Sequence, residues 1–159
     1  MPNQDPFRPV DDDALALSRA LLTGASHGAL GVIDPETGAP MVSRIAFALI
    51  EETPHTLISD LSHHSGALRA NPDASVLLGE PGPKGDPLTH PRLTLQARAE
   101  PADKAALRTD WLAACPKAKL YYDFADFSLV RLRPLWAHLN GGFGKAYRLT
   151  PDDLRRALA

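Results

Sequence analysis

The sequence predicts a mainly β protein with peripheral helices (α+β), folded as a six-stranded antiparallel barrel. Six short runs with strand character follow one another along the chain, and they do not alternate with βαβ crossover helices, which argues against a doubly wound sheet. With 159 residues and 44% hydrophobic residues, the chain is long enough to bury one core. We therefore expect one domain over residues 11–159, preceded by a flexible arm over residues 1–10.

The first expected elements are a helix and a hairpin. Three aspartates at 11–13 supply N-cap and dipole-compatible charge for a helix over residues 12–24, whose leucines recur at helical spacing. Residues 28–34 and 41–52 then have strand character. The segment DPETGAP between them is dense in turn residues, so the two strands are expected to pair as a hairpin.

The middle of the chain predicts three further strands. Residues 55–60 form the third strand, and a short helix that ends near Asn71 follows it because Pro72 comes next. Residues 74–80 form the fourth strand. Residues 80–91 are rich in proline and glycine and predict a loop, after which residues 92–100 alternate cleanly as the fifth strand.

The last part of the chain predicts two helices around one long strand. Residues 101–115 have a helical pattern between two prolines. Residues 127–140 fit a sixth strand, which is expected to bend. The segment GGFGKAY at 141–147 is either an irregular loop or a short strand, and residues 150–158 form a capped terminal helix.

Charge and cysteine content exclude several protein classes. The chain has 17 Lys+Arg and 19 Asp+Glu, a formal charge of −2, which argues against a nucleic-acid binder or a polybasic membrane-surface protein. No apolar run approaches the ~20 residues that span a bilayer. The N-terminus lacks the pattern of a signal peptide, and the single cysteine, Cys115, fits a reducing compartment. We expect a cytoplasmic protein.

Two polar motifs are candidates for a bound anion. Arg44 shares a strand face with Ala46 and Ala48, which leaves a flat shelf beside a cation, suited to a planar ring that carries a phosphate. The alternative is a solvated arginine on the outside of a sheet. In the second motif, His64 and Ser65 stand at a helix start shortly after Ser59, where side chains and free N–H groups can hold a phosphate. The alternative there is a helix cap with exposed histidines.

Other motifs give weaker signals. The polar side of strand 92–98 can face solvent, a ligand or a partner subunit. The loop at 141–145 lacks the spacing of a phosphate-binding P-loop, and no dinucleotide fingerprint is present. We interpret His138 as structural, and no metal site is expected, because no third ligand has suitable spacing. No hydrolytic triad is apparent, and catalytic residues stay unassigned.

Four motifs taken together resemble a known family. They are S-R before apolar residues on a strand, LISDLSHHS at a strand–helix junction, PRLTL, and GGFG, in that order along residues 14–155. The chain resembles the pyridoxamine 5′-phosphate oxidase-like proteins, and most of all their haem-utilisation branch. The resemblance implies an FMN-binding split β-barrel and a homodimer with two FMN sites at the subunit interface.

The resemblance also implies roles for particular residues. Arg44 would bind the FMN phosphate together with His64 and Ser65, and the backbone at Ile45 and Ala46 would lie against the ring. Ser59 would contact the flavin or its ribityl chain. Arg92 would reach the flavin, often from the neighbouring subunit. The loop of Gly142, Phe143 and Gly144 would lie near the ring.

Departures from the family pattern narrow the function. Pyridoxamine-phosphate oxidases have an Arg-Lys pair in place of His64-Ser65 and a lysine in place of Leu49, so that activity is not expected. Haem-binding members often carry a further C-terminal segment, which this sequence lacks or shortens. We expect an FMN-dependent oxidoreductase with a small-molecule substrate or electron donor. The alternatives are a haem-binding or haem-degrading protein, with His63, His64 or His138 as axial ligand, or a non-catalytic flavin binder.

Overall fold

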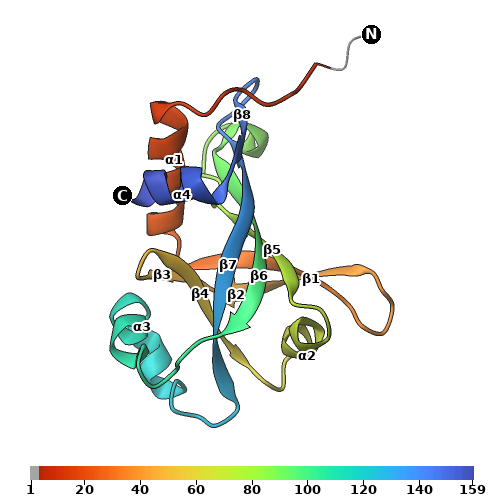
Figure 1. Ribbon diagram of the computed structural model, residues 1–159, viewed down its shortest axis with the longest axis vertical. Coiled ribbons are helices and arrows are strands. Elements are labelled where there is room, and N and C mark those ends of the chain that lie inside the picture. Colours follow the sequence, from red (N-terminus) through yellow and green to blue (C-terminus); the bar gives the residue numbers. More distant parts are fainter. Residues whose placement is uncertain (1–3) are drawn as a thin grey trace.

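The computed structural model describes residues 4–159, which form one eight-stranded antiparallel sheet curled into a half-barrel with helices around it (Figure 1). The strand order is β2-β1-β5-β6-β7-β4-β3, and β8 pairs with β7. The strands are β1 (His27–Ile33), β2 (Pro40–Ala46), β3 (Ala48–Ile50), β4 (Thr53–Ser59), β5 (Asp73–Leu78), β6 (Arg92–Pro101), β7 (Phe127–Asn140) and β8 (Ala146–Leu149). The helices are α1 (Asp12–Gly24), α2 (His63–Ala70), α3 (Arg108–Ala114) and α4 (Pro151–Leu158), with 3-10 turns at Pro87–Thr89 and Pro116–Leu120.

The expected fold class is confirmed, but the strand count is eight and not six. The expected strand 41–52 divides into β2 and β3, because Phe47 leaves the ladder, donates its N–H to the Ser26 carbonyl and is fully buried. β8 forms in the segment for which a loop or a short strand was expected. The expected helix 101–115 shortens to α3, since β6 runs on to Pro101 and turns occupy residues 104–107.

The core lies on one face of the sheet. Along β1, β5 and β6, buried side chains alternate with exposed or half-buried ones, as expected for a sheet with one buried face. The alternation expected for residues 92–98 is confirmed, with Leu93, Leu95 and Ala97 buried. Each fully buried leucine contributes roughly 1.5–3 kcal/mol relative to exposure. A second, smaller cluster surrounds Trp111 of α3 and includes Ala48 of β3.

Two helices cover one end of the sheet. α1 begins at Asp11, whose carboxylate accepts the N–H of Ala14 at 2.8 Å. α4 begins with a reciprocal capping box between Thr150 and Asp153. The two helices lie against each other beside β7, as Figure 1 shows at the upper left. No helix within residues 4–159 is long and apolar enough to cross a membrane.

β7 contains a β-bulge, which corresponds to the bend expected in this strand. Gln96 of β6 pairs with Trp136, whereas the next residue, Ala97, pairs with Pro134, so Leu135 has no partner in the ladder. Proline is tolerated at such a position because it has no N–H to donate.

The bulge changes which side chains of β7 face the core. Leu132 is buried before the bulge, and Ala137 and Leu139 are buried after it, which is a shift of one residue from strict alternation. Trp136 and His138 therefore lie on the face opposite the core.

The chain before α1 runs along β8 at the same end of the sheet (Figure 1). Arg8 forms an isolated bridge with Tyr147, and its N–H donates to the Ala146 carbonyl at 2.8 Å. Residues 1–3 of the expected arm lie outside the described residues.

Candidate cofactor-binding face

The face of the sheet opposite the core carries two rows of side chains. Paired residues of antiparallel strands share a face, so the register fixes each row. The first row contains Arg44, Ala29, Leu77, Thr94, His138 and Arg148. The second row contains Val42, Gly31, Ser75, Gln96 and Trp136. All eleven residues are exposed or half-buried, and we call this surface the open face.

The centre of the open face is shallow and partly apolar. Ala29 and Gly31 have a small side chain or none, and a groove of about 440 Å³ runs beside Gly31, Ser75 and Gln96. The side chain of Val42 is 68% exposed. Exposed apolar area on a sheet face is typical of a surface that binds a ligand or another protein.

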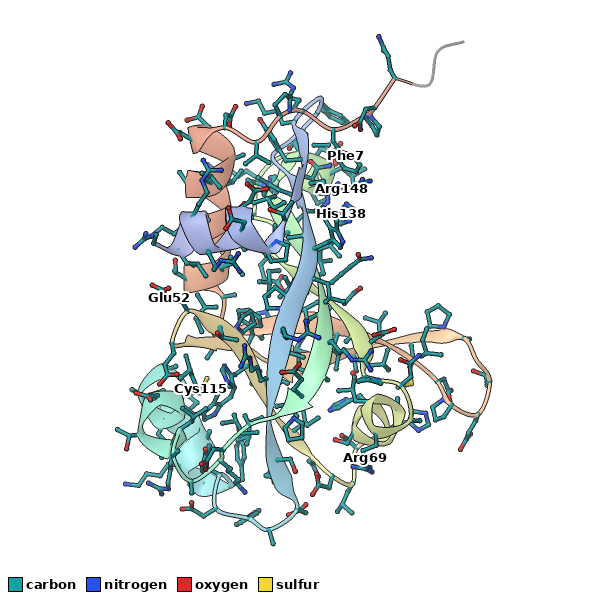
Figure 2. All side chains as sticks on the ribbon, viewed as in Figure 1. Phe7, Glu52, Arg69, Cys115, His138 and Arg148 are labelled. Carbon is teal, nitrogen blue, oxygen red and sulfur yellow. The ribbon has the colours of Figure 1, made fainter. Side chains whose placement is uncertain are left out.

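An aromatic cluster forms one end of the open face. The ring of Phe7, from the segment before α1, lies 5.6 Å from the ring of His138, at an interplanar angle of 59°. The guanidinium carbon of Arg148 lies 4.4 Å from the centre of the Phe7 ring and 5.9 Å from that of Trp136. Figure 2 shows Phe7, Arg148 and His138 together beside β7 and β8.

His138 has an unused imidazole. Neither ring nitrogen of His138 has a hydrogen-bond partner among residues 4–159, although the side chain is half-buried. A neutral imidazole with a free nitrogen is a common metal ligand. The described residues contain no group of three His, Cys, Asp or Glu side chains that would hold a bare metal ion, so a metal at His138 would need other ligands.

The N-terminus of α2 forms a separate cluster next to β2. Ser43 Oγ lies 3.0 Å from Nδ1 of His64, and His63 Nε2 lies 3.3 Å from the Asp34 carboxylate. Burial lowers the pKa of His64 below its ordinary value, and the charge of His63 lowers it further. His64 is therefore neutral near pH 7 and contributes no positive charge to this cluster.

The serines of the cluster bond to the protein itself. Ser62 Oγ and Ser65 Oγ both donate to the Ser59 carbonyl at 2.6 Å, and they lie 3.0 Å from each other. The side chain of Ser62 does not cap α2, although Ser62 is the N-cap residue. The first N–H groups of α2 therefore have no side-chain cap and are free to bind an anion.

The residues expected around an FMN phosphate fall on two sides of β2. Ser43 points toward His64 of α2, so the neighbouring Arg44 extends from the opposite side, onto the open face. Arg44 has no hydrogen-bond or ion-pair partner within residues 4–159. Ile45 is buried in the main core, whereas Ala46 packs against the second cluster.

The remaining predicted residues lie at opposite ends of β7. Ser59 pairs with Phe127 at the start of β7, whereas Arg92 pairs with Asn140 at its end. β7 has 14 residues, and a strand of that length spans roughly 40 Å. The loop with Gly142, Phe143 and Gly144 follows Asn140, so it lies with Arg92 and away from Ser59, His64 and Ser65.

Sequence reasoning missed the aromatic cluster. Phe7, Trp136 and Arg148 were not singled out, and His138 was interpreted as structural. The pattern FSLVRLRPLWAHLN offers one signal, because Pro134 marks the bulge that turns Trp136 and His138 outward. Nothing in the sequence pattern places Phe7 beside them.

A separate cleft of about 630 Å³ lies between α2 and the lower parts of β6 and β7. Its charged groups mostly have partners within the chain. Asp60 accepts the hydroxyl of Ser128 at 2.7 Å, and Lys104 donates to the carbonyls of Phe124 and Phe127. Ser65 is the one predicted site residue that lines this cleft among those described.

Comparison with characterised proteins identifies relatives along most of the chain. No family model matches. The chain is 33% identical over 136 residues to the chloroplastic non-canonical heme oxygenase HOZ of Arabidopsis thaliana. The match covers 81% of this chain and 40% of the relative, so the chain spans less than half the length of that protein.

Solved structures extend the likeness to the fold. A heme binding protein from Mycobacterium smegmatis superposes with a TM-score of 0.82 at 30% identity, over 94% of this chain and 62% of that one. A protein of the pyridoxinephosphate oxidase family from Clostridium acetobutylicum, related to a general stress protein, gives a TM-score of 0.71 over 91% of this chain and 99% of that one. At 16% identity the second likeness concerns the fold alone.

Proposed function

Because the chain belongs to the split-barrel family of pyridoxamine 5′-phosphate oxidase-like proteins, we propose that it binds haem on the open face and takes part in haem breakdown. The proposal rests on His138, whose free imidazole stands on that face among aromatic side chains. The names of the Arabidopsis and mycobacterial relatives point to the same ligand.

The residues of the open face fit a haem. Haem iron takes an axial imidazole, which His138 would supply, and the porphyrin needs an apolar surface, which Val42, Leu77 and Trp136 would provide. The haem would be bound as a substrate, with its iron providing the oxygen chemistry. The protein's own part is to hold the ring and to exclude water from one of its sides.

A homodimer is part of the proposal. Arg92 and the loop after Asn140 lie about one length of β7 from Ser59, which is farther than one cofactor can reach. If both groups contact one ligand, one of them must come from a second subunit. The exposed apolar side chains of the open face support this arrangement, because they would be covered in such a dimer.

The test is an absorption spectrum of the purified protein with added haem, for the wild type and three single variants. We expect a shifted Soret band for the wild type and for His63→Ala, and its loss in His138→Ala. His64→Ala serves as the matched control, since His64 also has a free ring nitrogen but lies beside α2. Loss of the band in His64→Ala with retention in His138→Ala would reject the assignment of the ligand.

FMN is a second candidate, and the uncapped N-terminus of α2 favours it. The flavin phosphate would bind the free N–H groups there, and the protein would then be a flavin-dependent oxidoreductase or a flavin carrier. The test is retention of FMN through gel filtration. Arg44→Ala should weaken retention if Arg44 reaches around the edge strand β2 to the phosphate, and unchanged retention would reject that placement. For either cofactor we propose a cytoplasmic setting, where Cys115 stays reduced.

A further inference from the structure

The guanidinium of Arg148 lies near two aromatic rings. It lies 4.4 Å from the centre of the Phe7 ring and 5.9 Å from the centre of the Trp136 ring. Contact with aromatic rings restricts the position of a guanidinium and leaves its N–H groups available to a ligand. The side chain is therefore oriented before any ligand arrives.

Arg148 has no acidic partner among residues 4–159, unlike five of the twelve arginines of the chain. Five arginines form ion pairs with carboxylates at 2.6–3.2 Å, namely Arg98, Arg108, Arg133, Arg155 and Arg156. Arg148 forms no hydrogen bond or ion pair with any residue from 4 to 159, although the chain has 19 acidic residues. An oriented guanidinium with its donors free is the residue type that binds a carboxylate in bidentate fashion.

The position of Arg148 links it to the proposed haem ligand. Arg148 pairs directly with His138 across β7 and β8, so the two side chains leave the same face side by side. An extended arginine side chain carries its guanidinium away from its own Cβ. A ligand with its metal at His138 can therefore place a peripheral carboxylate at Arg148.

We propose that Arg148 binds a propionate of the porphyrin whose iron lies at His138, so that this site selects porphyrins with free carboxylates. The inference rests on the proposed haem function, and it adds that the site recognises the negative charge of the propionate. Phe7 is then a positioning residue, because its ring contacts both His138 and Arg148 and would keep the guanidinium in place (Figure 2).

The experiment compares two probes, ferric mesoporphyrin and its dimethyl ester, which lacks the carboxylates. Dissociation constants are measured from the Soret band for the wild type, Arg148→Gln and Arg98→Gln. Arg98 is the matched control, since it is an exposed arginine on the same face of β6 that is already paired with Asp73. Thermal unfolding of each variant shows whether it is folded.

We expect Arg148→Gln to bind mesoporphyrin about tenfold more weakly, which is the loss of one hydrogen-bonded charge pair. The same variant should bind the ester as the wild type does, and Arg98→Gln should bind both probes normally. Phe7→Ala should weaken the binding of mesoporphyrin less than Arg148→Gln does, and it should leave the binding of the ester unchanged. These results together would support the assignment of Arg148.

Three outcomes would overturn the inference. Equal weakening of acid and ester in Arg148→Gln would mean that Arg148 supports the fold of the site and does not bind the carboxylate. A loss in Arg148→Gln of FMN retention but not of mesoporphyrin binding would assign the guanidinium to a phosphate. Binding of neither porphyrin by the wild type would reject the haem function itself, and with it this inference.

Discussion

Ser43 Oγ and His64 Nδ1 lie 3.0 Å apart, joining β2 to the first turn of α2. Burial of His64 and the nearby His63 lower the pKa of the His64 imidazole below the 6.5 of a free histidine. His55, which is buried against β7, has its pKa lowered chiefly by burial as well. The folded protein therefore resists protonation of two histidines that protonate readily in the unfolded chain.

The free energy of unfolding should fall as the solution is acidified. Below pH 6.5 the unfolded chain binds protons at His55 and His64 before the folded chain does, so acid favours unfolding until the lowered pKa values are passed. Urea unfolding between about pH 7.5 and 5.5 measures the slope of the free energy of unfolding against pH. His64→Gln should reduce the slope, whereas Ser43→Ala, which keeps the titrating ring, should retain it. An unchanged slope in His64→Gln would contradict the prediction.

Deletion of Leu135 should remove the bulge without turning Trp136 and His138 toward the core. Leu135 has no partner in the ladder, so its removal makes Pro134 and Trp136 adjacent, opposite Ala97 and Gln96, and regular alternation then keeps Ala137 and Leu139 in the core. We expect a loss of about 1–3 kcal/mol in urea unfolding, because Pro134 would then stand in a regular ladder. Leu135→Ala keeps the bulge and should cost about 1 kcal/mol. A loss far above about 3 kcal/mol for the deletion would contradict this geometry.

Gly79→Ala should destabilise the turn that leads toward Arg92. Gly79 has φ 109°, and an added Cβ would lie 2.6 Å from the Pro91 carbonyl oxygen and 3.0 Å from Arg92 Cα. Both the backbone conformation and the contact oppose a side chain, so we expect a cost of about 2–4 kcal/mol in urea unfolding. Gly24→Ala is the control, because nothing lies within 4 Å of an added Cβ there and a helix-terminal alanine should stabilise slightly. A neutral Gly79→Ala would mean that the turn can rearrange.

Local patterns predicted most of the fold. The alternation of residues 92–100 and the aspartates before α1 each led to an element that the structure contains. The division at Phe47 was not predictable from alternation, because a buried aromatic is compatible with an unbroken strand. The true length of α3 was missed for a related reason, since the pairing of β6 with β7 extends through Pro101 and overrides the helical pattern of the next residues.

The candidate site was less predictable than the fold. Motifs placed Ser59, His64 and Ser65 near one another, and the structure has them around α2. The position of Arg44 on the other side of β2 follows from tertiary contacts of its neighbour Ser43. The meeting of Phe7 with Arg148 joins segments about 140 residues apart in sequence, and no local pattern encodes such a contact.

The two tryptophans of the chain differ in a way that makes the protein its own optical probe. Trp111 of α3 is fully buried, whereas Trp136 is 42% exposed on the open face. A dissolved quencher such as iodide reaches only the second of them, so the quenchable part of the intrinsic fluorescence reports on the open face alone. If subunits meet through that face, the emission of Trp136 will become shielded as the protein concentration rises, and Trp111 will provide the unchanged reference in the same sample.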